Sequence, residues 1–185
     1  MDKRMREMRY YVSNGEGVHV LIKLTAAFTA AAVVATACLV IWEAPLAVAL
    51  LLAGWLWCYA LWVMKHAIVE IVRSARLART VGKGAEAAVQ LIDFEAAASL
   101  CGDRLRVGRR FIFARKGGVI SCEALRRACL ARKRTKDSVF VIYLAEDAGG
   151  AQRMLARWRE EQFEQEDAER ISFALAERCR HITFG

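Results

Sequence analysis

The chain has 185 residues, of which 56% are hydrophobic, and its 28 Lys and Arg against 20 Asp and Glu give a formal net charge of +8. This length allows about one domain, or one small domain with membrane segments, and the apolar fraction is above the 45–50% or so of soluble domains. A soluble protein would need a much larger chain to bury so many apolar residues. The length and composition therefore exclude that arrangement and favour insertion into a membrane.

Two uncharged apolar runs, Leu24–Trp42 and Ala44–Met64, are separated only by Glu43. Each run is close to the roughly 20 residues that a helix needs to cross the hydrocarbon core. We therefore expect a two-helix transmembrane hairpin over residues 21–64. Its short connector can only join antiparallel neighbours, and Pro45 suits the first turn of the second helix, where a backbone N–H is not needed.

Lys and Arg flank both spans and are absent from the connector between them. Because positively charged loops stay in the cytoplasm, we expect a multi-pass protein of the inner or plasma membrane. Its N-terminal segment (residues 1–20) and its C-terminus should both be cytoplasmic. The stretch Ala35–Cys38 resembles a lipoprotein cleavage site, but the apolar run continues beyond it, which favours an uncleaved first helix over a signal peptide.

Small residues recur along the first span, and they let transmembrane helices approach closely. We favour packing of the two spans on each other, and an oligomer interface is the alternative; these residues are Ala26, Ala27, Ala30, Ala31, Ala35 and Thr36. Aromatic rings collect where a bilayer meets water, which indicates membrane-interface anchors at Trp42, Trp57, Tyr59 and Trp62.

No Gly or Pro interrupts the chain between Met64 and Gly82, so we expect a basic juxtamembrane helix over residues 65–83. It either continues as a stalk or bends along the headgroups. Each cation near anionic lipid contributes about 1 kcal/mol. A topology signal is favoured over a lipid sensor; the cations are Lys65, Arg73, Arg76, Arg79 and Lys83.

Residues 84–185 alternate between helical and strand-like patterns, which predicts a small cytoplasmic α+β domain. Its expected helices lie near 85–101 and 160–180, the first with an apolar face of Val89, Ile92, Ala96 and Leu100. Its expected strands lie near 104–107, 111–113, 119–121, 123–134, 139–144 and 152–158. A short helical turn leads into the strand within 123–134, and the pattern of residues 152–158 equally fits the start of a helix.

The order of these elements, with the segments RRFIFARKGGVIS, SVFVIYLA and a terminal HITFG, resembles a group of uncharacterised bacterial two-span proteins, the YcxB-like group and its relatives. The resemblance covers most of the chain. It implies a soluble part with an antiparallel, PH-like sheet and flanking helices. It supplies no catalytic residues.

The sequence has no nucleotide-binding loop, no G-x-S-x-G and no His-rich helix. Its six cysteines and three histidines lack the spacing of a metal or redox site. We therefore expect a protein that is not an enzyme, with no catalytic residue, no metal site and no cofactor.

Charge is separated along the soluble part, with a basic stretch from Arg104 to Lys136 and acids from Glu160 to Glu169. We favour contact of the basic stretch with anionic lipid headgroups or an acidic partner. Pairing of the basic and acidic segments, within the chain or between copies, is the second interpretation, and nucleic acid is disfavoured. Besides Lys65, Arg73, Arg76 and Arg79, the candidate contacts are Arg109, Arg110, Arg132, Lys133 and Arg134.

The combined features favour a non-enzymatic, membrane-tethered interaction or sensing module whose partner is the lipid bilayer itself. The alternative is an accessory subunit of a larger membrane complex, bound to itself or to a membrane partner protein through the small-residue face of the first span.

Overall fold

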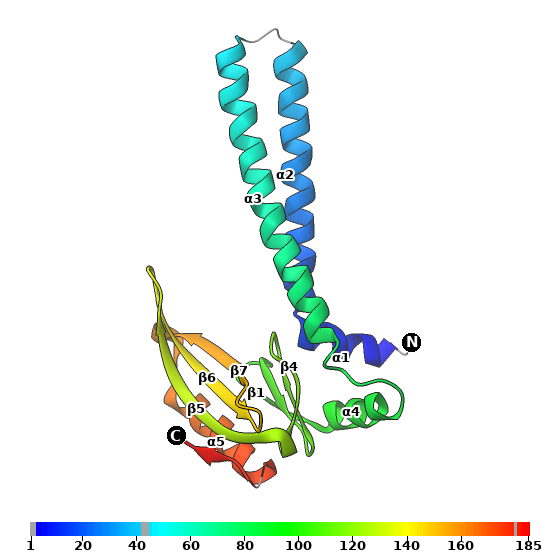
Figure 1. The fold of residues 1–185 in the computed structure, drawn as a ribbon, viewed down its shortest axis with the longest axis vertical. Helices are drawn as coiled ribbons and strands as arrows, with labels where there is room; N and C mark the ends of the chain where they lie inside the picture. Colours follow the sequence, from blue (N-terminus) through cyan, green and yellow to red (C-terminus); the bar gives the residue numbers. More distant parts are fainter. Residues whose placement is uncertain (1–2, 42–44, 180) are drawn as a thin grey trace. The chain divides into compact units, whose positions relative to one another are not determined.

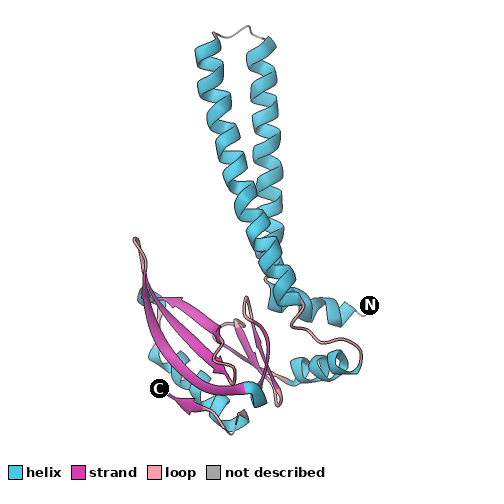
Figure 2. Ribbon diagram, in the orientation of Figure 1, coloured by secondary structure: helices cyan, strands magenta, loops and turns pink. Residues whose placement is uncertain are grey.

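The computed structural model describes residues 3–41, 45–179 and 181–185. The chain divides into two units (Figures 1 and 2): a helical hairpin unit, Gly15–Ala75, and a soluble unit made of the residues up to Asn14 together with Arg76–Gly185. In chain order the elements are α1 (Lys3–Ser13), α2 (Gly15–Ile41), α3 (Leu46–Ala78), α4 (Ala85–Ala96), β1 (Ala98–Leu100), β2 (Leu105–Val107), β3 (Phe111–Ala114), β4 (Gly118–Ser121), η1 (Cys122–Ala124), β5 (Leu125–Arg134), β6 (Val139–Asp147), β7 (Gln152–Arg159), η2 (Glu160–Gln162), α5 (Gln165–Arg178) and β8 (Thr183–Phe184).

In the hairpin unit, α2 and the Ala53–Ala78 part of α3 are long and apolar enough to cross a membrane. The two helices run side by side (Figure 1). The indole Nε1 of Trp57 donates to the hydroxyl of Thr36 at 3.2 Å, and the ring of Phe28 meets that of Tyr59 edge-on at 4.7 Å between centroids. The prediction that the second helix continues beyond Met64 is confirmed as far as Ala78.

The expected packing of small residues between the two helices is wrong for most of them. Ala26, Ala27, Ala30 and Ala31 are exposed, and Ala32 is the buried residue of α2. The helices meet instead through large aromatic side chains such as Phe28, and the four exposed alanines lie on another face of α2.

Helix α1 belongs to the soluble unit, although the sequence predicted only a cytoplasmic segment there. Met8 and Val12 lie one helical turn apart and are both fully buried. They pack in one cluster with Val81, Phe94, Phe113 and Val119, which come from the segments after the hairpin. Arg4 also contacts Glu95 of α4 at 3.1 Å. The chain segments before and after the hairpin therefore fold together.

The soluble unit contains two four-stranded sheets. The first sheet has the order β1-β2-β3-β4 and is antiparallel throughout. The second sheet has the order β7-β6-β5-β8, in which β8 pairs with β5 in parallel and the other pairs are antiparallel. The expected class, two apolar helices with a small α+β domain of antiparallel sheets, is confirmed at this level.

Alternation along β6 divides the second sheet into two faces. Its inner face carries Val141, Tyr143 and Ala145, which are all buried. Tyr143 and Ala145 lie in a core with Leu105 and Ile112 of the first sheet and with Ile171 and Leu175 of α5. Its outer face carries the alternate residues Phe140, Ile142 and Leu144, which are half-buried. Helix α5 thus covers the inner face only.

The structure corrects two expectations about α4. The helix ends at Ala96, because residues 98–100 pair with β2 as strand β1. Its predicted apolar face is also wrong, since Val89 and Ile92 are exposed while Gln90 and Asp93 are buried. The polar side chains turn inward because they satisfy backbone N–H groups: Gln90 accepts from Gly82 at 2.8 Å, and Asp93 accepts from the β2–β3 turn.

Helix α5 begins at Gln165, five residues later than expected, because residues 160–162 form the 3-10 turn η2. The strand expected over 139–144 extends to Asp147, and the strand expected over 152–158 is β7. Strand β8 was not predicted, because two residues carry too short a pattern.

Candidate functional site

The cations predicted beyond the second span lie on one exposed strip. Lys65, Arg73 and Arg76 are on α3 and Arg79 follows it, and all four side chains are exposed. The spacing of three between Arg73, Arg76 and Arg79 keeps them close together on a helical surface. Glu70 lies 4.0 Å from Arg73; in the described part of the chain, Lys65, Arg76 and Arg79 have no salt bridge.

The end of this strip is attached to the first sheet through Thr80. The hydroxyl of Thr80 donates to the carbonyl of Leu77 at 2.6 Å and accepts from the N–H of Val119 at 2.9 Å. Gly118 has φ +83°, and a Cβ there would approach the Thr80 hydroxyl to 2.7 Å. Together with the buried Val81, this contact holds residues 80 and 81 on the first sheet.

Arg109 and Arg110 lie in the turn between β2 and β3. The carboxylate of Asp93 accepts hydrogen bonds from the N–H groups of residues 109, 110 and 111 at 2.8, 3.0 and 2.8 Å. Such consecutive amides are a binding position for an anion, and here the protein's own carboxylate fills it. The side chains of Arg109 and Arg110 remain exposed.

Arg132, Lys133 and Arg134 end strand β5, in the other sheet, so the structure separates them from Arg109 and Arg110. Alternation points Arg132 toward the inner face, where its Nε lies 3.7 Å from Glu160 of η2. Lys133 points to the outer face, opposite Phe140 of β6. The cations that the sequence analysis grouped together therefore lie on at least two separate surfaces.

Strand β7 adds two cations that the sequence did not single out. Arg159 pairs with Phe140 across the strands, and the guanidinium of Arg157 lies 3.6 Å from the centroid of the Phe140 ring. Lys133, Arg157 and Arg159 thus surround one aromatic ring on the outer face. We call these four residues the Phe140 cluster; in the described residues no acid forms a salt bridge with its cations. Only the β6–β7 register could have revealed the cluster.

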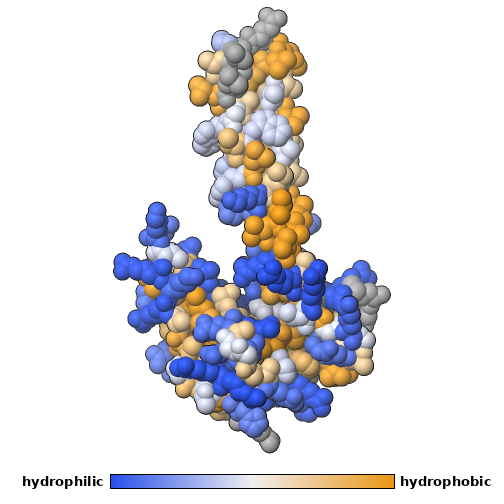
Figure 3. All heavy atoms as spheres, viewed as in Figure 1, coloured by the Kyte–Doolittle hydropathy of each residue, from blue (hydrophilic) through white to orange (hydrophobic). Residues whose placement is uncertain are grey.

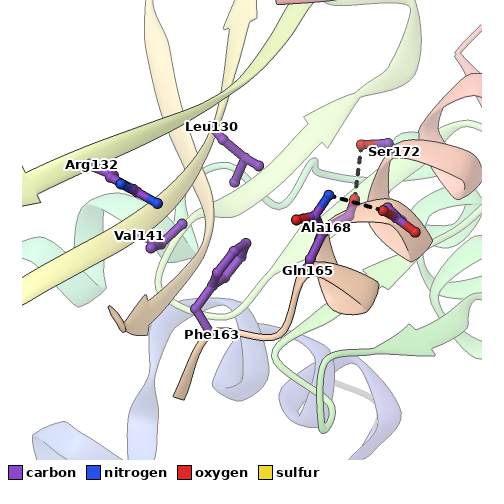
Figure 4. A pocket seen from close by; sticks show the side chains of 8 residues that line it. Leu130, Arg132, Val141, Phe163, Gln165, Ala168 and Ser172 are labelled. Carbon is purple, nitrogen blue, oxygen red and sulfur yellow. Dashed lines mark hydrogen bonds between the residues drawn. The ribbon is translucent and has the colours of Figure 1, made fainter. Parts of the chain in front are cut away.

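A cavity of about 440 Å³ lies between the inner face and α5 (Figure 4). The Tyr143 hydroxyl and the Ser172 hydroxyl beside this cavity are 2.7 Å apart and share a hydrogen bond. Burial raises the pKa of Tyr143 above its ordinary value. The cavity is lined by Leu130, Arg132, Val141, Phe163, Gln165, Ala168, Glu169 and Ser172.

At Cys101 and Cys122 of the soluble unit, the surroundings raise the pKa of the thiol. Cys122 and Cys179 are buried in the same core, and their contact, with burial, raises the pKa of the Cys122 thiol. Burial also raises the pKa of Cys101 to about 11. Among the described residues, no three His, Cys, Asp or Glu side chains are grouped as a metal site requires.

The predicted membrane anchors lie along α3, except for Trp42, which is outside the described residues. Trp57 and Tyr59 contact α2, as described above. Trp62 is exposed and its ring stacks on Tyr59, with centroids 5.7 Å apart, and meets His66 edge-on at 4.4 Å. These aromatic contacts form a stripe along the helix, and anchoring stays a prediction.

Hydrophilic side chains gather on the soluble unit, whereas apolar side chains cover much of the visible hairpin unit (Figure 3). The resemblance to the YcxB-like group, and the PH-like fold that it implies, stay predictions. No protein-family model, curated protein or solved structure matches this chain.

Proposed function

We propose that this chain is a membrane-tethered, non-enzymatic interaction or sensing module of the inner or plasma membrane. In this proposal α2 and α3 cross the bilayer as a hairpin, and the soluble unit, a PH-like domain, lies in the cytoplasm. The observation that carries the proposal is the burial of Met8 and Val12 of α1 among residues that follow the hairpin. Because a bilayer cannot divide a folded core, this burial supports placing both flanks on one side, and the flanking Lys and Arg favour the cytoplasm.

Exposure of the apolar helices supports insertion. A long apolar helix in a soluble protein is buried in a core, but most of α2 is exposed, including Val34, Val40 and Ile41. Its 27 residues reach about 40 Å at 1.5 Å per residue, close to the thickness of a bilayer with its headgroups. Lipid is the cover that such a surface requires.

The position of α1 also argues against cleavage of the first span at Cys38. Removal of the residues before Cys38 would detach α1 and open the core around Met8 and Val12. An uncleaved first helix keeps that core closed.

Contact with anionic headgroups follows from the length of α3. The stretch Leu46–Val72 also reaches about 40 Å, so in this proposal Arg73, Arg76 and Arg79 meet the cytoplasmic headgroups. Each contributes about 1 kcal/mol near an anionic surface, and Arg76 and Arg79 have no competing salt bridge in the described part of the chain. In this proposal the module therefore binds anionic lipid through the cations at the C-terminal end of α3.

One observation favours the second candidate, an accessory subunit of a membrane complex. The exposed alanines Ala26, Ala27, Ala30 and Ala31 leave a flat face on α2, and such faces let helices approach closely. Copurification of a partner in mild detergent, lost on Ala30→Leu and Ala27→Leu, would support it.

Hydrogen exchange of the full chain in nanodiscs tests the lipid contact. We expect slower exchange at residues 76–81 in phosphatidylglycerol than in phosphatidylcholine, and loss of the difference at high salt. Arg76→Gln with Arg79→Gln should abolish the difference, whereas Arg126→Gln, an exposed β5 cation, should not. Equal exchange in both lipids would refute headgroup binding.

A further inference from the structure

The Phe140 cluster on the outer face has the composition of a docking surface. Its aromatic ring is half-buried and lies beside the half-buried Ile142, while Lys133, Arg157 and Arg159 are exposed around it. The guanidinium of Arg104 donates to the carbonyl of Arg157 at 3.1 Å, which holds this end of β7. An apolar centre with a cationic rim fits a protein surface with an apolar centre and an acidic rim.

Helix α5 presents such a surface. Phe173 is 75% exposed, and Glu169 and Glu177 lie one turn before and one turn after it on the same side of the helix. We call these three residues the Phe173 face. Glu169 accepts a hydrogen bond from Gln165 at 3.3 Å, and Glu177 lies 3.5 Å from Arg178.

The acids that lead into α5 reinforce this charge. Among the described residues, Glu161, Glu164 and Asp167 form no salt bridge, and Glu160 and Glu166 are the members of this acidic run that do. Arg132 and Glu160 join the basic and acidic stretches, so among the described residues the charge separation is only partly neutralised within one chain.

We propose that the Phe173 face of one copy docks on the Phe140 cluster of a second copy. Phe173 loses its exposure against Phe140 and Ile142, which removes a large apolar side chain from water and favours association. Glu169 and Glu177 then lie near Arg157 and Arg159. This contact is weak for free proteins, but anchoring in one membrane raises the effective concentration of the copies.

The two surfaces lie on opposite sides of the second sheet. Helix α5 packs on the inner face, where Ser172 bonds to Tyr143, and Phe140 points to the outer face because it lies at alternate positions from Val141 and Tyr143. In a two-fold dimer, one partner would have to contact both surfaces of a copy at once. Their positions on opposite sides of the sheet prevent this. The docking is therefore head-to-tail and builds rows or closed rings of more than two copies.

Photo-crosslinking of the full chain in its membrane tests this proposal. We replace Phe173 with the photoreactive residue p-benzoylphenylalanine, irradiate the membranes and separate the products by size. We expect a ladder of dimers, trimers and larger products, cross-linked to peptides of β5–β7. Arg157→Glu with Arg159→Glu should lower the yield about tenfold, because like charges then face each other.

Adding Glu169→Arg and Glu177→Arg to that chain should restore the ladder, which also shows that the reversed chains fold. Arg109→Glu with Arg110→Glu makes the same charge change on the first sheet and should leave the ladder intact. Absence of cross-linked protein, a ladder insensitive to the reversal, or a product that stops at the dimer would each overturn the proposal. The proposal would also be overturned if the Arg157→Glu, Arg159→Glu chain kept the ladder but bound phosphatidylglycerol more weakly. The cluster would then bind lipid rather than a second copy.

Discussion

Met8→Ala tests whether α1 is held in the soluble unit. Met8 is fully buried with Val12 in the cluster of Val81 and Phe94. Burial of these two α1 side chains contributes about 1.5–3 kcal/mol each, so hydrophobic docking of α1 amounts to roughly 3–6 kcal/mol. A buried Met→Ala change costs about 2–5 kcal/mol, which removes a third or more of that docking energy.

Limited trypsin digestion of the full chain in detergent measures this loss, because α1 carries Arg4, Arg6 and Arg9 as cleavage sites. Cleavage follows the population of the open helix when opening is fast. A loss of 2 kcal/mol raises that population about 30-fold. Glu7→Ala, at an exposed position of the same helix, is the control; equal cleavage of Met8→Ala and Glu7→Ala would show that α1 is not docked.

Three further predictions concern the contacts that shape the soluble unit, each read from thermal unfolding of the full chain. Asp93→Asn replaces one of two acceptor oxygens with a donor and should cost about 2–4 kcal/mol; an unchanged midpoint would contradict the clamp on the β2–β3 turn. Thr80→Val leaves the N–H of Val119 unpaired and should cost about 1–3 kcal/mol, whereas Thr80→Ser should be close to wild type; equal losses would assign the role to the methyl group. Hydrogen bonding by Arg106 lowers the pKa of Asp103. The stabilisation that this pair contributes is therefore present above about pH 4 and is lost as pH falls through the lower pKa of the folded state. Asp103→Asn should weaken this acid sensitivity, and an unaltered pH profile of the unfolding midpoint would contradict the prediction.

The features predicted correctly from the sequence are those encoded locally. Uninterrupted apolar runs specify α2 and α3, and the continuous run of β-branched and aromatic residues after Ser138 specifies β6. The helical conformation of Lys65–Ala78 is also encoded locally, because no Gly or Pro ends the helix there.

The features that were missed depend on tertiary contacts. Helix α1 reads as a polar segment until Met8 meets the cluster formed after the hairpin. Asp93 occupies a helix position that a solvent-facing acid would also suit, and only the β2–β3 turn draws it inward.

The Phe140 cluster depends on strand register. A bulge between Tyr143 and Leu144 shifts the pairing of β6 with β7, so alternation alone does not say which β7 side chains accompany Phe140. Arg157 and Arg159 are brought beside Lys133 by that pairing, and no spacing in the sequence indicates it.

Paired topology reporters test the central claim most directly, that both flanks of the α2–α3 hairpin share the cytoplasmic side. Green fluorescent protein and alkaline phosphatase are fused in turn after Gly185 and inserted in turn beside Pro45. The account predicts fluorescence without phosphatase activity after Gly185, and phosphatase activity without fluorescence beside Pro45. Phosphatase activity after Gly185 would contradict it.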